Sequence, residues 1–595
     1  MQASRTFPNS AGEERGIGDP SAVPPRRMQL LALFVAVGVI IAVQFFGASP
    51  SVAILVAVAA LAAALPEEIR FSIDRLRTSP VLRSVLIEEP SRVLWLIALG
   101  GAGLRIRAFL VDRALWLDEA YLARSFLDRD LIDLLTVPLA HNQSAPPGFL
   151  VLTRTSVGLF GFHEWSLRLP VLGASLLTLI LAVHIAKKAF ASPLAAATFM
   201  GLVSLSPFLV YYSQEFKQYS FDALAAAVVL LVSSLPSRRR RHVWIGLALA
   251  LTALVSLPGA ILVTILVAID LIRVERLKDL WRHVPVAVLT AFGVLLHLVY
   301  TARAGTNRAR MVAFWQGHSF PPDGGLFEQL RWHFDKSLEL MWVGLAHGSV
   351  GGRRVGVGET WLVLLFALVA ANSLRKRTPA VELALIAILG FVLLAQMNLY
   401  PLGTRLTLYM VPLFALLFAQ GFESLWADGP PPRSMLRLVL ALVMLLPTSV
   451  SSDRLREPSN QSDIRLAVET LNSRFAAGDV IVSNAFSRTA FNLYTDAGLI
   501  APQFSVRWTS DSRGSAATVG AILDDVLGDE GSGVLPRRVW VVASHRTVEL
   551  REGARIAAAE RSLQPVCDTL RGGVLFALYA EGSDDLDDSM CDIAR

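Results

Sequence analysis

The chain has 595 residues, of which 53% are hydrophobic and only 17% are charged. Its mean hydropathy is +0.51. Soluble domains carry about 25% charged residues, so this composition excludes an ordinary soluble protein. The net charge of +6 comes from short basic clusters between apolar runs, which indicates membrane topology rather than nucleic-acid binding.

The N-terminal region is expected to lie outside the main fold. Residues 1–27 are polar and rich in Pro, Gly, Ser and Arg, which predicts a disordered cytoplasmic tail without a cleavable signal peptide. Apolar runs at about 28–47 and 49–65 predict an extra transmembrane hairpin, because about 20 apolar residues span the hydrocarbon core. A basic cytoplasmic loop then extends to residue 92, completing the region 28–92.

Residues 93–450 are expected to form the transmembrane core. Basic clusters on both flanks of 244–270 require two short passes that turn near Pro258-Gly259, whereas 148–162 is expected to lie in the interface. We therefore predict a polytopic α-helical membrane protein of about thirteen transmembrane helices with its N-terminus inside. The other core spans fall at about 93–111, 169–186, 193–212, 220–236, 284–302, 358–373, 380–397, 407–425 and 435–450.

The tail, residues 451–595, has a different character. It lacks long apolar runs, and short buried-strand patterns at 479–482 and 538–542 predict a soluble α/β domain outside the membrane. The two cysteines of the chain, Cys567 and Cys591, both lie here. An oxidising exterior would let them pair, and two unpaired thiols are the alternative.

The first predicted external loop opens with two adjacent carboxylates. Asp118 and Glu119 follow the 93–111 span in an otherwise apolar stretch. Anionic groups at a low-dielectric boundary are costly unless they bind a cation or exchange a proton. An acidic pair at the start of a solvated helix is the open alternative. Further along the loop, His141 precedes two prolines that start the 148–162 helix.

Two further external turns carry charge. Glu215, Lys217 and Tyr219 alternate, so they share a face if the segment is extended; an aromatic belt at the interface is the alternative. Arg405, followed by Tyr409, breaks the positive-inside trend of the other loops. A guanidinium there predicts an anionic partner such as phosphate, unless it extends to lipid headgroups.

Five short motifs occur in the order typical of a known family. They are Leu-Asp-Glu-Ala at 117–120, a His before Pro-Pro at 141–147, Phe-Gly…Arg-Leu-Pro at 160–170, Ser-Pro…Tyr-Tyr-Ser-Gln-Glu at 206–215 and Tyr-Pro-x-Gly-x-Arg at 400–405. Together they resemble bacterial GT-C superfamily glycosyltransferases related to protein O-mannosyltransferases and lipid A aminoarabinose transferases. The likeness covers about 93–425, and 463–494 resembles the soluble extension of some members.

This resemblance implies a GT-C-like glycosyltransferase of the bacterial inner membrane. Its donor would be a sugar on a polyprenyl phosphate, transferred with inversion to a lipid, glycan or protein acceptor on the extracytoplasmic face. Asp118 would be the general base, Glu119 would support it, and Glu215 would hold the acceptor. A divalent cation shared by Asp118 and Glu215 stays open, and no other cofactor is implied. The substrate-binding residues would be Lys217 and Arg405, which hold the lipid phosphate, together with His141, Tyr219 and Tyr409.

Two questions stay open at this point. The external segment 303–357 either covers the active site or anchors the protein in the interface. A transporter of a lipid-linked or anionic substrate is a rival function, and it predicts ionisable residues at mid-span and repeated halves. A non-enzymatic envelope assembly protein is another rival, for which Asp118 and Glu119 would be dispensable.

Overall fold

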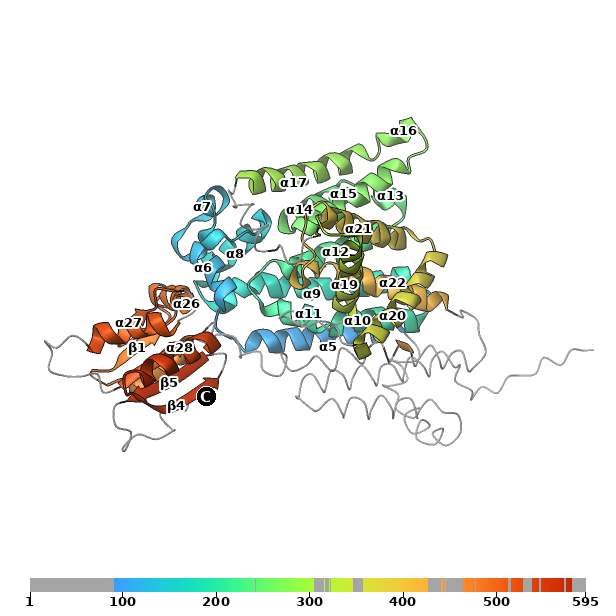
Figure 1. Cartoon of the computed structure of the whole chain (residues 1–595). Helices are drawn as coiled ribbons and strands as arrows, with labels where there is room; N and C mark the ends of the chain where they lie inside the picture. The colour runs from blue at the N-terminus through green and yellow to red at the C-terminus, as the bar shows by residue number, and fades with distance from the viewer. Residues whose placement is uncertain are drawn as a thin grey trace, which may run out of the picture.

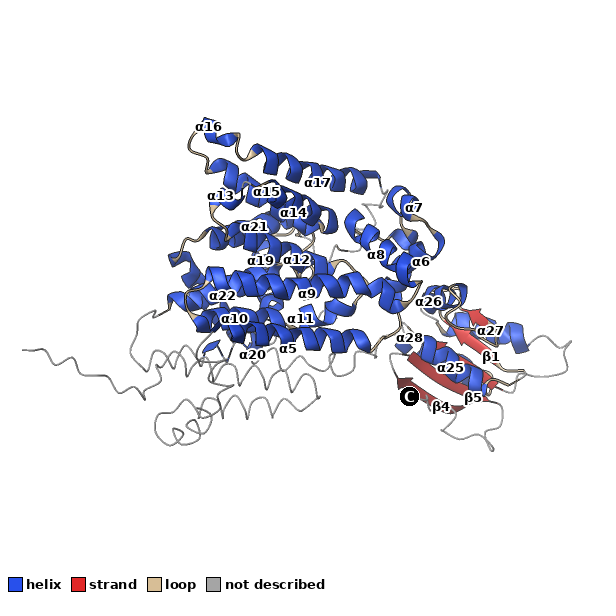
Figure 2. Ribbon diagram, turned by 180° about the vertical axis from the view of Figure 1, so that it is seen from behind, coloured by secondary structure: helices blue, strands red, loops and turns tan. Residues whose placement is uncertain are grey.

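The computed structural model places a helical bundle beside a small sheet domain (Figure 1, Figure 2). The predicted N-terminal tail and hairpin lie outside the described residues, as does most of the span predicted at 435–450. The structure describes residues 90–240, 242–303, 315, 320–321, 323–345, 357–425, 440–441, 443, 445, 464–476, 478–511, 515–527, 538–544, 547–571 and 574–580.

Several helices of the bundle begin with a Ser or Thr N-cap followed by a proline in the first turn. Ser192, Ser256 and Thr378 each cap a helix that has proline in its first turn, an arrangement that satisfies the free N–H groups there. The α-helices are α5 Pro90–Leu110, α6 Leu117–Asp128, α7 Leu131–Thr136, α8 Pro147–Phe160, α9 Glu164–Ala189, α10 Pro193–Leu205, α11 Pro207–Tyr211, α12 Tyr219–Ser233, α13 Ser237–Arg240, α14 Val243–Val255, α15 Leu257–Ile272, α16 Leu277–Leu280, α17 Val284–Arg303, α19 Leu326–Leu345, α20 Val357–Ala371, α21 Pro379–Gln396 and α22 Met410–Ser424; single 3₁₀ turns are η2 Ala140–Asn142, η3 Tyr212–Gln214, η5 Asn372–Arg375 and η6 Thr404–Thr407.

Four helices in the described part of the chain, α5, α9, α17 and α21, are long and apolar enough to cross a membrane. A fifth span results if α10 and α11 with η3, bent by 44° at their junction, count as one. Further apolar helices, including α12, α14, α15 and α22, are shorter. The apolar helices agree with an integral membrane protein, but the predicted number of about thirteen stays a prediction.

α17 shows how the bundle meets the lipid. Its outer face exposes large apolar side chains, among them Val288, Phe292 and Leu295. Such a stripe would be a liability in water, whereas lipid solvates it. Its inner face packs on α14, where a Cβ at Gly293 would lie only 2.6 Å from the Cα atom of Ala250. Glycine at this position lets the two helices approach closely.

The structure shows what two segments left open by the sequence, 244–270 and 303–357, look like. The break in 244–270 falls at Ser256, two residues before the predicted Pro258, and α14 packs against α15. The segment 303–357 contains α19, a helix that was not predicted from the sequence. Leu338 and Leu340 of α19 are buried in the bundle core, and the Nζ atom of Lys336 donates to the carbonyl oxygen of Leu402 at 3.0 Å.

The C-terminal domain has the predicted α/β character. Its five-stranded sheet has the order β2-β1-β3-β5-β4; β2, β1 and β3 are parallel, and β5 is antiparallel to β3 and β4. Cys567 in β4 is disulfide-bonded, and its predicted partner Cys591 lies outside the described residues. The elements are α25 Ile464–Arg474, β1 Val480–Ser483, α26 Ala485–Asp496, β2 Val506–Trp508, α27 Ala516–Leu527, β3 Arg538–Ala543, α28 Thr547–Ala559, β4 Gln564–Arg571 and β5 Val574–Ala580.

This domain is attached to the bundle through α26, which packs on α6 (Figure 1, Figure 2). The hydroxyl of Tyr494 accepts a hydrogen bond from the N–H of Leu115 at 2.7 Å, and Tyr494 is fully buried. Arg124 of α6 pairs with Asp496 of α26. Buried apolar side chains of both regions form one continuous cluster. The tail domain is therefore packed onto the start of α6 rather than tethered by its linker alone.

Candidate functional site

The three predicted external turns converge on one cavity of about 520 Å³. Asp118 and Tyr121 reach it from α6, and Lys217 reaches it from the turn before α12. Tyr219 is the first residue of α12, and Arg405 lies in η6. These positions are far apart in the sequence, so their meeting is a property of the fold. Other residues that line the cavity include His141, Gln143, Asp222, His297, Thr301, Trp315, Asn398 and Tyr400.

Asp118 and Arg405 meet directly at this cavity. The Nη1 atom of Arg405 lies 2.7 Å from the Oδ2 atom of Asp118, and both side chains are partly exposed to the cavity. The guanidinium also lies over the ring of Trp315, 5.3 Å from its centroid. The anionic partner predicted for Arg405 is thus a carboxylate of the first loop. Trp315 shows that the segment 303–357 reaches the cavity.

Glu119 is turned away from the cavity. It is fully buried and accepts two hydrogen bonds from Arg168, at 3.0 and 2.8 Å, and others from the N–H groups of Trp116 and Phe216. The Nη2 atom of Arg113 lies 3.4 Å from it. Burial opposes the charged form, but Arg113 and Arg168 hold the pKa of Glu119 below its usual range. Glu119 therefore connects the first turn of α6 to α9 and to the second turn.

The second turn is not extended as the alternation required. The 3₁₀ turn η3 leads into a tight turn in which the N–H of Lys217 donates to the carbonyl oxygen of Glu215 at 2.6 Å. Lys217 and Tyr219 line the cavity, whereas Glu215 lies behind them, 4.0 Å from Arg113. Burial and the nearby Glu119 raise the pKa of Glu215 to about 7. Of the three residues predicted to share a face, Lys217 and Tyr219 line the cavity together and Glu215 does not.

Lys217 is a buried cation facing open volume. Its Nζ atom donates to the Oε1 atom of Gln143 at 2.6 Å, and it makes no ion pair within the described part of the chain. Burial lowers the pKa of Lys217. A cation with one neutral partner, held beside a second cation, has the charge and the hydrogen-bond donors that suit an anion.

The remaining predicted residues separate into two groups. His141 lines the cavity in the left-handed region at φ 53°, and its ring stacks on Tyr121 with centroids 4.4 Å apart. Tyr409 does not line the cavity. It is fully buried against Phe391, with ring centroids 4.2 Å apart. Tyr409 therefore belongs to the packing beneath the Arg405 turn.

No cluster of three or more His, Cys, Asp or Glu side chains suited to a metal occurs among the residues described. The two carboxylates proposed to share a cation both face guanidinium groups instead: Asp118 faces Arg405, and Glu215 faces Arg113. A cation shared by Asp118 and Glu215 stays a prediction.

Sequence reasoning missed the residues that support this site. Arg113 and Arg168 read as ordinary basic residues, although Arg168 belongs to the Arg-Leu-Pro motif. Their role appears only when Glu119 is placed between them. His297 and Thr301 lie in an apolar span, where a polar residue is costly and is a usable signal for a cavity.

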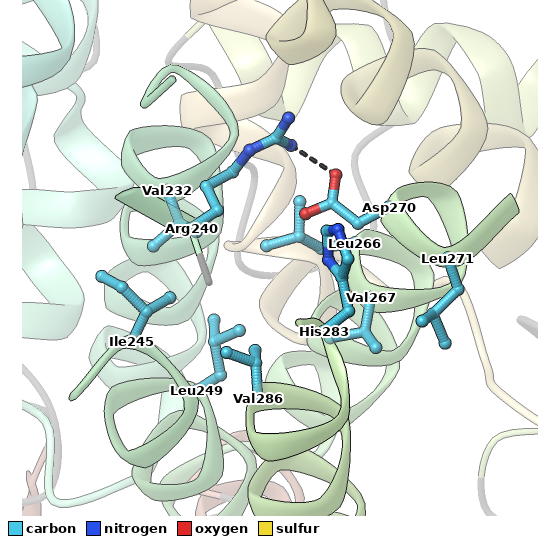
Figure 3. Close-up of a pocket in the computed structure, with 10 residues that line it drawn as sticks. All are labelled: Val232, Arg240, Ile245, Leu249, Leu266, Val267, Asp270, Leu271, His283 and Val286. Carbon is cyan, nitrogen blue, oxygen red and sulfur yellow. Dashed lines mark hydrogen bonds and ion pairs between the residues drawn. The ribbon is translucent and has the colours of Figure 1, made fainter. Parts of the chain in front are cut away.

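A second polar pocket lies at the far end of α14 and α17 (Figure 3). There Arg240 pairs with Asp270, and His283 lies beside them among aliphatic side chains. Its volume is about 10 Å³, enough for no more than one water molecule. This pocket is therefore filled by the side chains around the Arg240–Asp270 ion pair and is too small for a substrate.

Residues 144–300 match the model of the dolichyl-phosphate-mannose-protein mannosyltransferase family. The resemblance to protein O-mannosyltransferases is thereby confirmed over this stretch, which includes Glu215, Lys217 and Tyr219 but neither Asp118 nor Arg405. No curated protein matches the chain at a significant level.

Solved structures with a similar arrangement include ArnT from Cupriavidus metallidurans in the apo state. It is 14% identical with a TM-score of 0.46, and the likeness covers 82% of this chain and 98% of that one. The same protein bound to undecaprenyl phosphate is 15% identical with a TM-score of 0.44, covering 83% and 98%.

Proposed function

We propose that this chain is a membrane glycosyltransferase that moves a sugar from a polyprenyl phosphate to an acceptor hydroxyl, with inversion, on the extracytoplasmic face of the bacterial inner membrane. The observation that carries the proposal is Lys217, a buried cation without a carboxylate partner among the described residues, next to Arg405 in one cavity. Two cations there suit a lipid phosphate and stabilise the charge on the leaving group. The family match over 144–300 supports this donor class.

Asp118 is the proposed general base. It takes the proton of the acceptor hydroxyl, whose oxygen forms a bond to the anomeric carbon while the bond from that carbon to the phosphate oxygen breaks. The electron pair leaves with the lipid phosphate, which Lys217 and Arg405 hold. When the phosphate engages Arg405, the Oδ2 atom of Asp118 loses its 2.7 Å contact and is free to accept the proton.

Glu119 and Glu215 are proposed positioning residues, because neither lines the cavity. Glu119 fixes the first turn of α6 through Arg168 and Arg113, and so sets where Asp118 points. Glu215 lies in the same buried layer, 4.0 Å from Arg113. Both act through other residues and touch no substrate in this scheme.

An apolar groove offers room for the lipid tail. It has a volume of about 440 Å³ between α8, α9, α12 and α14, and it shares the α12 wall with the cavity, since Phe221 lines the groove and Asp222 the cavity. A lipid tail enters this groove from the hydrocarbon of the bilayer, so what it gains there is van der Waals packing rather than removal from water. The groove is lined by Leu152, Pro170, Gly173, Ala174, Leu177, Phe221, Leu224, Ala225, Val228, Ala248, Leu251, Thr252 and Val255.

The buried arginine in α5 gives the transporter alternative no support. Arg105 is fully buried, and its guanidinium donates to the Oγ atom of Ser175 at 2.8 Å and to the carbonyl oxygen of Ser204 at 2.8 Å. An ionisable group whose donors are taken up between helices binds neighbours rather than cargo. Arg105 is therefore a structural link between α5, α9 and α10.

The test is sugar transfer by membranes that contain the full chain, with radiolabelled polyprenyl-phosphate sugars as donors. Asp118→Asn keeps the shape of the side chain and removes the base, so transfer should fall about 10²- to 10⁴-fold. Asp133→Asn, an exposed change on α7, is the matched control and should transfer like the wild type. Equal transfer by Asp118→Asn and the wild type would refute the base assignment, and no transfer by the wild type from any donor would refute the function.

A further inference from the structure

One wall of the cavity has no role in the proposed mechanism. Asp222 in the first turn of α12, and His297 and Thr301 near the end of α17, all line it. Asp222 and His297 are each only 2% exposed. Polar groups buried to this extent in an apolar bundle are costly unless they bind something.

Asp222 offers a carboxylate oxygen to the cavity. Its Oδ1 atom accepts a hydrogen bond from the Oγ atom of Ser256 at 2.6 Å, and that Oγ atom in turn accepts from the N–H of Gly259 at 2.8 Å. These bonds fix the orientation of the carboxylate. Its Oδ2 atom has no hydrogen-bond partner within the described ranges, although the side chain lines the cavity.

His297 and Thr301 also present acceptors. The Nδ1 atom of His297 lies 2.7 Å from the carbonyl oxygen of Ala253. A carbonyl oxygen can only accept, so Nδ1 carries the proton and Nε2 of the neutral ring is an acceptor. The hydroxyl of Thr301 donates to the carbonyl oxygen of His297 at 2.9 Å, which leaves its lone pairs for a ligand.

The cavity is therefore chemically polarised. Lys217 and Arg405 can only donate hydrogen bonds, whereas Asp222, His297 and Thr301 are arranged to accept them. A ligand that fits both walls carries an anion at one end and several O–H donors beside it. A sugar joined to a phosphate has this pattern.

We propose that Asp222, His297 and Thr301 form the subsite that holds the transferred sugar ring of the donor, by accepting hydrogen bonds from its hydroxyl groups. This rests on the proposed function, because it takes the donor to be a lipid phosphate sugar. Lys217 lies in the turn before α12 and Asp222 in the first turn of that helix, and both line the same cavity.

The test compares donors with and without individual hydroxyl groups. Full-length protein in membranes is given a polyprenyl-phosphate hexose that the wild type uses, and then the monodeoxy analogues of that donor. Asp222→Asn and Thr301→Val should each lose about 10- to 100-fold in kcat/KM on the complete sugar. Thr290→Val is the matched control for Thr301→Val, since Thr290 is buried in the same helix, α17, and does not line the cavity.

The deoxy donors separate binding from folding. The defect of each variant should shrink to the level of the control on the one analogue that lacks the hydroxyl group it binds. A purely structural role would lower transfer from every donor by the same factor. If the wild type transfers and both variants lose equally on all donors, the subsite is refuted and the proposed function stands. If the wild type transfers from no donor, both are refuted.

Discussion

Two charged clusters lie near the two ends of α17, and they differ in what surrounds them. At one end Asp118, Lys217 and Arg405 border about 520 Å³ of open volume. At the other, Arg240 and Asp270 close a pocket of about 10 Å³. Both contain an Arg–Asp pair, so charge alone does not distinguish them. The open space, and a cation (Lys217) that has no carboxylate partner among the described residues, make one end the candidate site. The other end is a structural contact.

Removing the arginine from each pair tests the difference between the two ends most directly. Arg405→Gln should lower transfer about 10²- to 10³-fold, because it removes a phosphate contact and charge stabilisation of the leaving group. Arg240→Gln should leave transfer per folded molecule unchanged and cost about 1.5–3 kcal/mol of stability, because it removes the charged hydrogen bond to the partly buried Asp270. Donor turnover and thermal unfolding in detergent measure the two effects. A loss of turnover in both variants would show that the pocket with Arg240 also contributes to transfer, and would contradict the distinction between the two ends of α17.

Lys217, which has the amide of Gln143 as its partner and no carboxylate among the described residues, is the next point of contrast. Lys217→Met keeps much of the side-chain volume and should lower kcat/KM about 10- to 100-fold, mainly through KM for the lipid donor. Lys188→Met, at the exposed end of α9, is the control and should have no effect. Steady-state kinetics with varied donor would check it. Unchanged donor kinetics in Lys217→Met would remove the main support for the anion site.

The contact between the tail and α6 should have a smaller effect. Tyr494→Phe removes the acceptor for the N–H of Leu115 and leaves that donor buried. The expected cost is about 1–3 kcal/mol of stability, together with faster proteolysis of the tail. Tyr579→Phe in β5 is the control within the same domain. Equal protease resistance in the two variants would argue that the hydrogen bond contributes nothing.

The smallest expected effect concerns pH. The pKa of Glu215 rises from an ordinary value near 4.5 to about 7 in the folded chain. Between these values the folded state holds more protons, so its stability falls as pH rises and levels off above about 7. Glu215→Gln cannot ionise, so its Tm should exceed that of the wild type by a margin that widens from about pH 5 to about pH 8. Glu328→Gln, an exposed change on α19, is the control, and its Tm should differ from that of the wild type by the same amount at every pH in this range.

The sequence predicted the elements better than the contacts between them. Apolar runs located α9, α17 and α21 within a few residues, because a helix that faces lipid is recognisable from its composition. The carboxylates and cations of the site were also found, because charge near a membrane boundary is costly. α19 was missed, since it is amphipathic and carries charged residues among its apolar ones.

Other features were out of reach because they depend on partners distant in the sequence. Nothing near Glu119 reveals that Arg168, 49 positions away, holds it in place. The tight turn at Glu215 likewise follows from the packing of α9 and α6 around it, which overrides the simple alternation of residues. The prediction of a common face depended on an extended segment, and because the chain turns here, Lys217 and Tyr219 line the cavity whereas Glu215 does not.

The hydrogen bond from Leu115 to Tyr494 joins residues 379 positions apart. A chain made from its N-terminus therefore inserts most of its bundle long before the partner of Leu115 exists. Until α26 has been synthesised and has docked, the start of α6 lacks that partner. Assembly of the helix that carries Asp118 is thus completed by a segment synthesised long after it. A product truncated before residue 485 would be inserted in the membrane but unfinished at this helix.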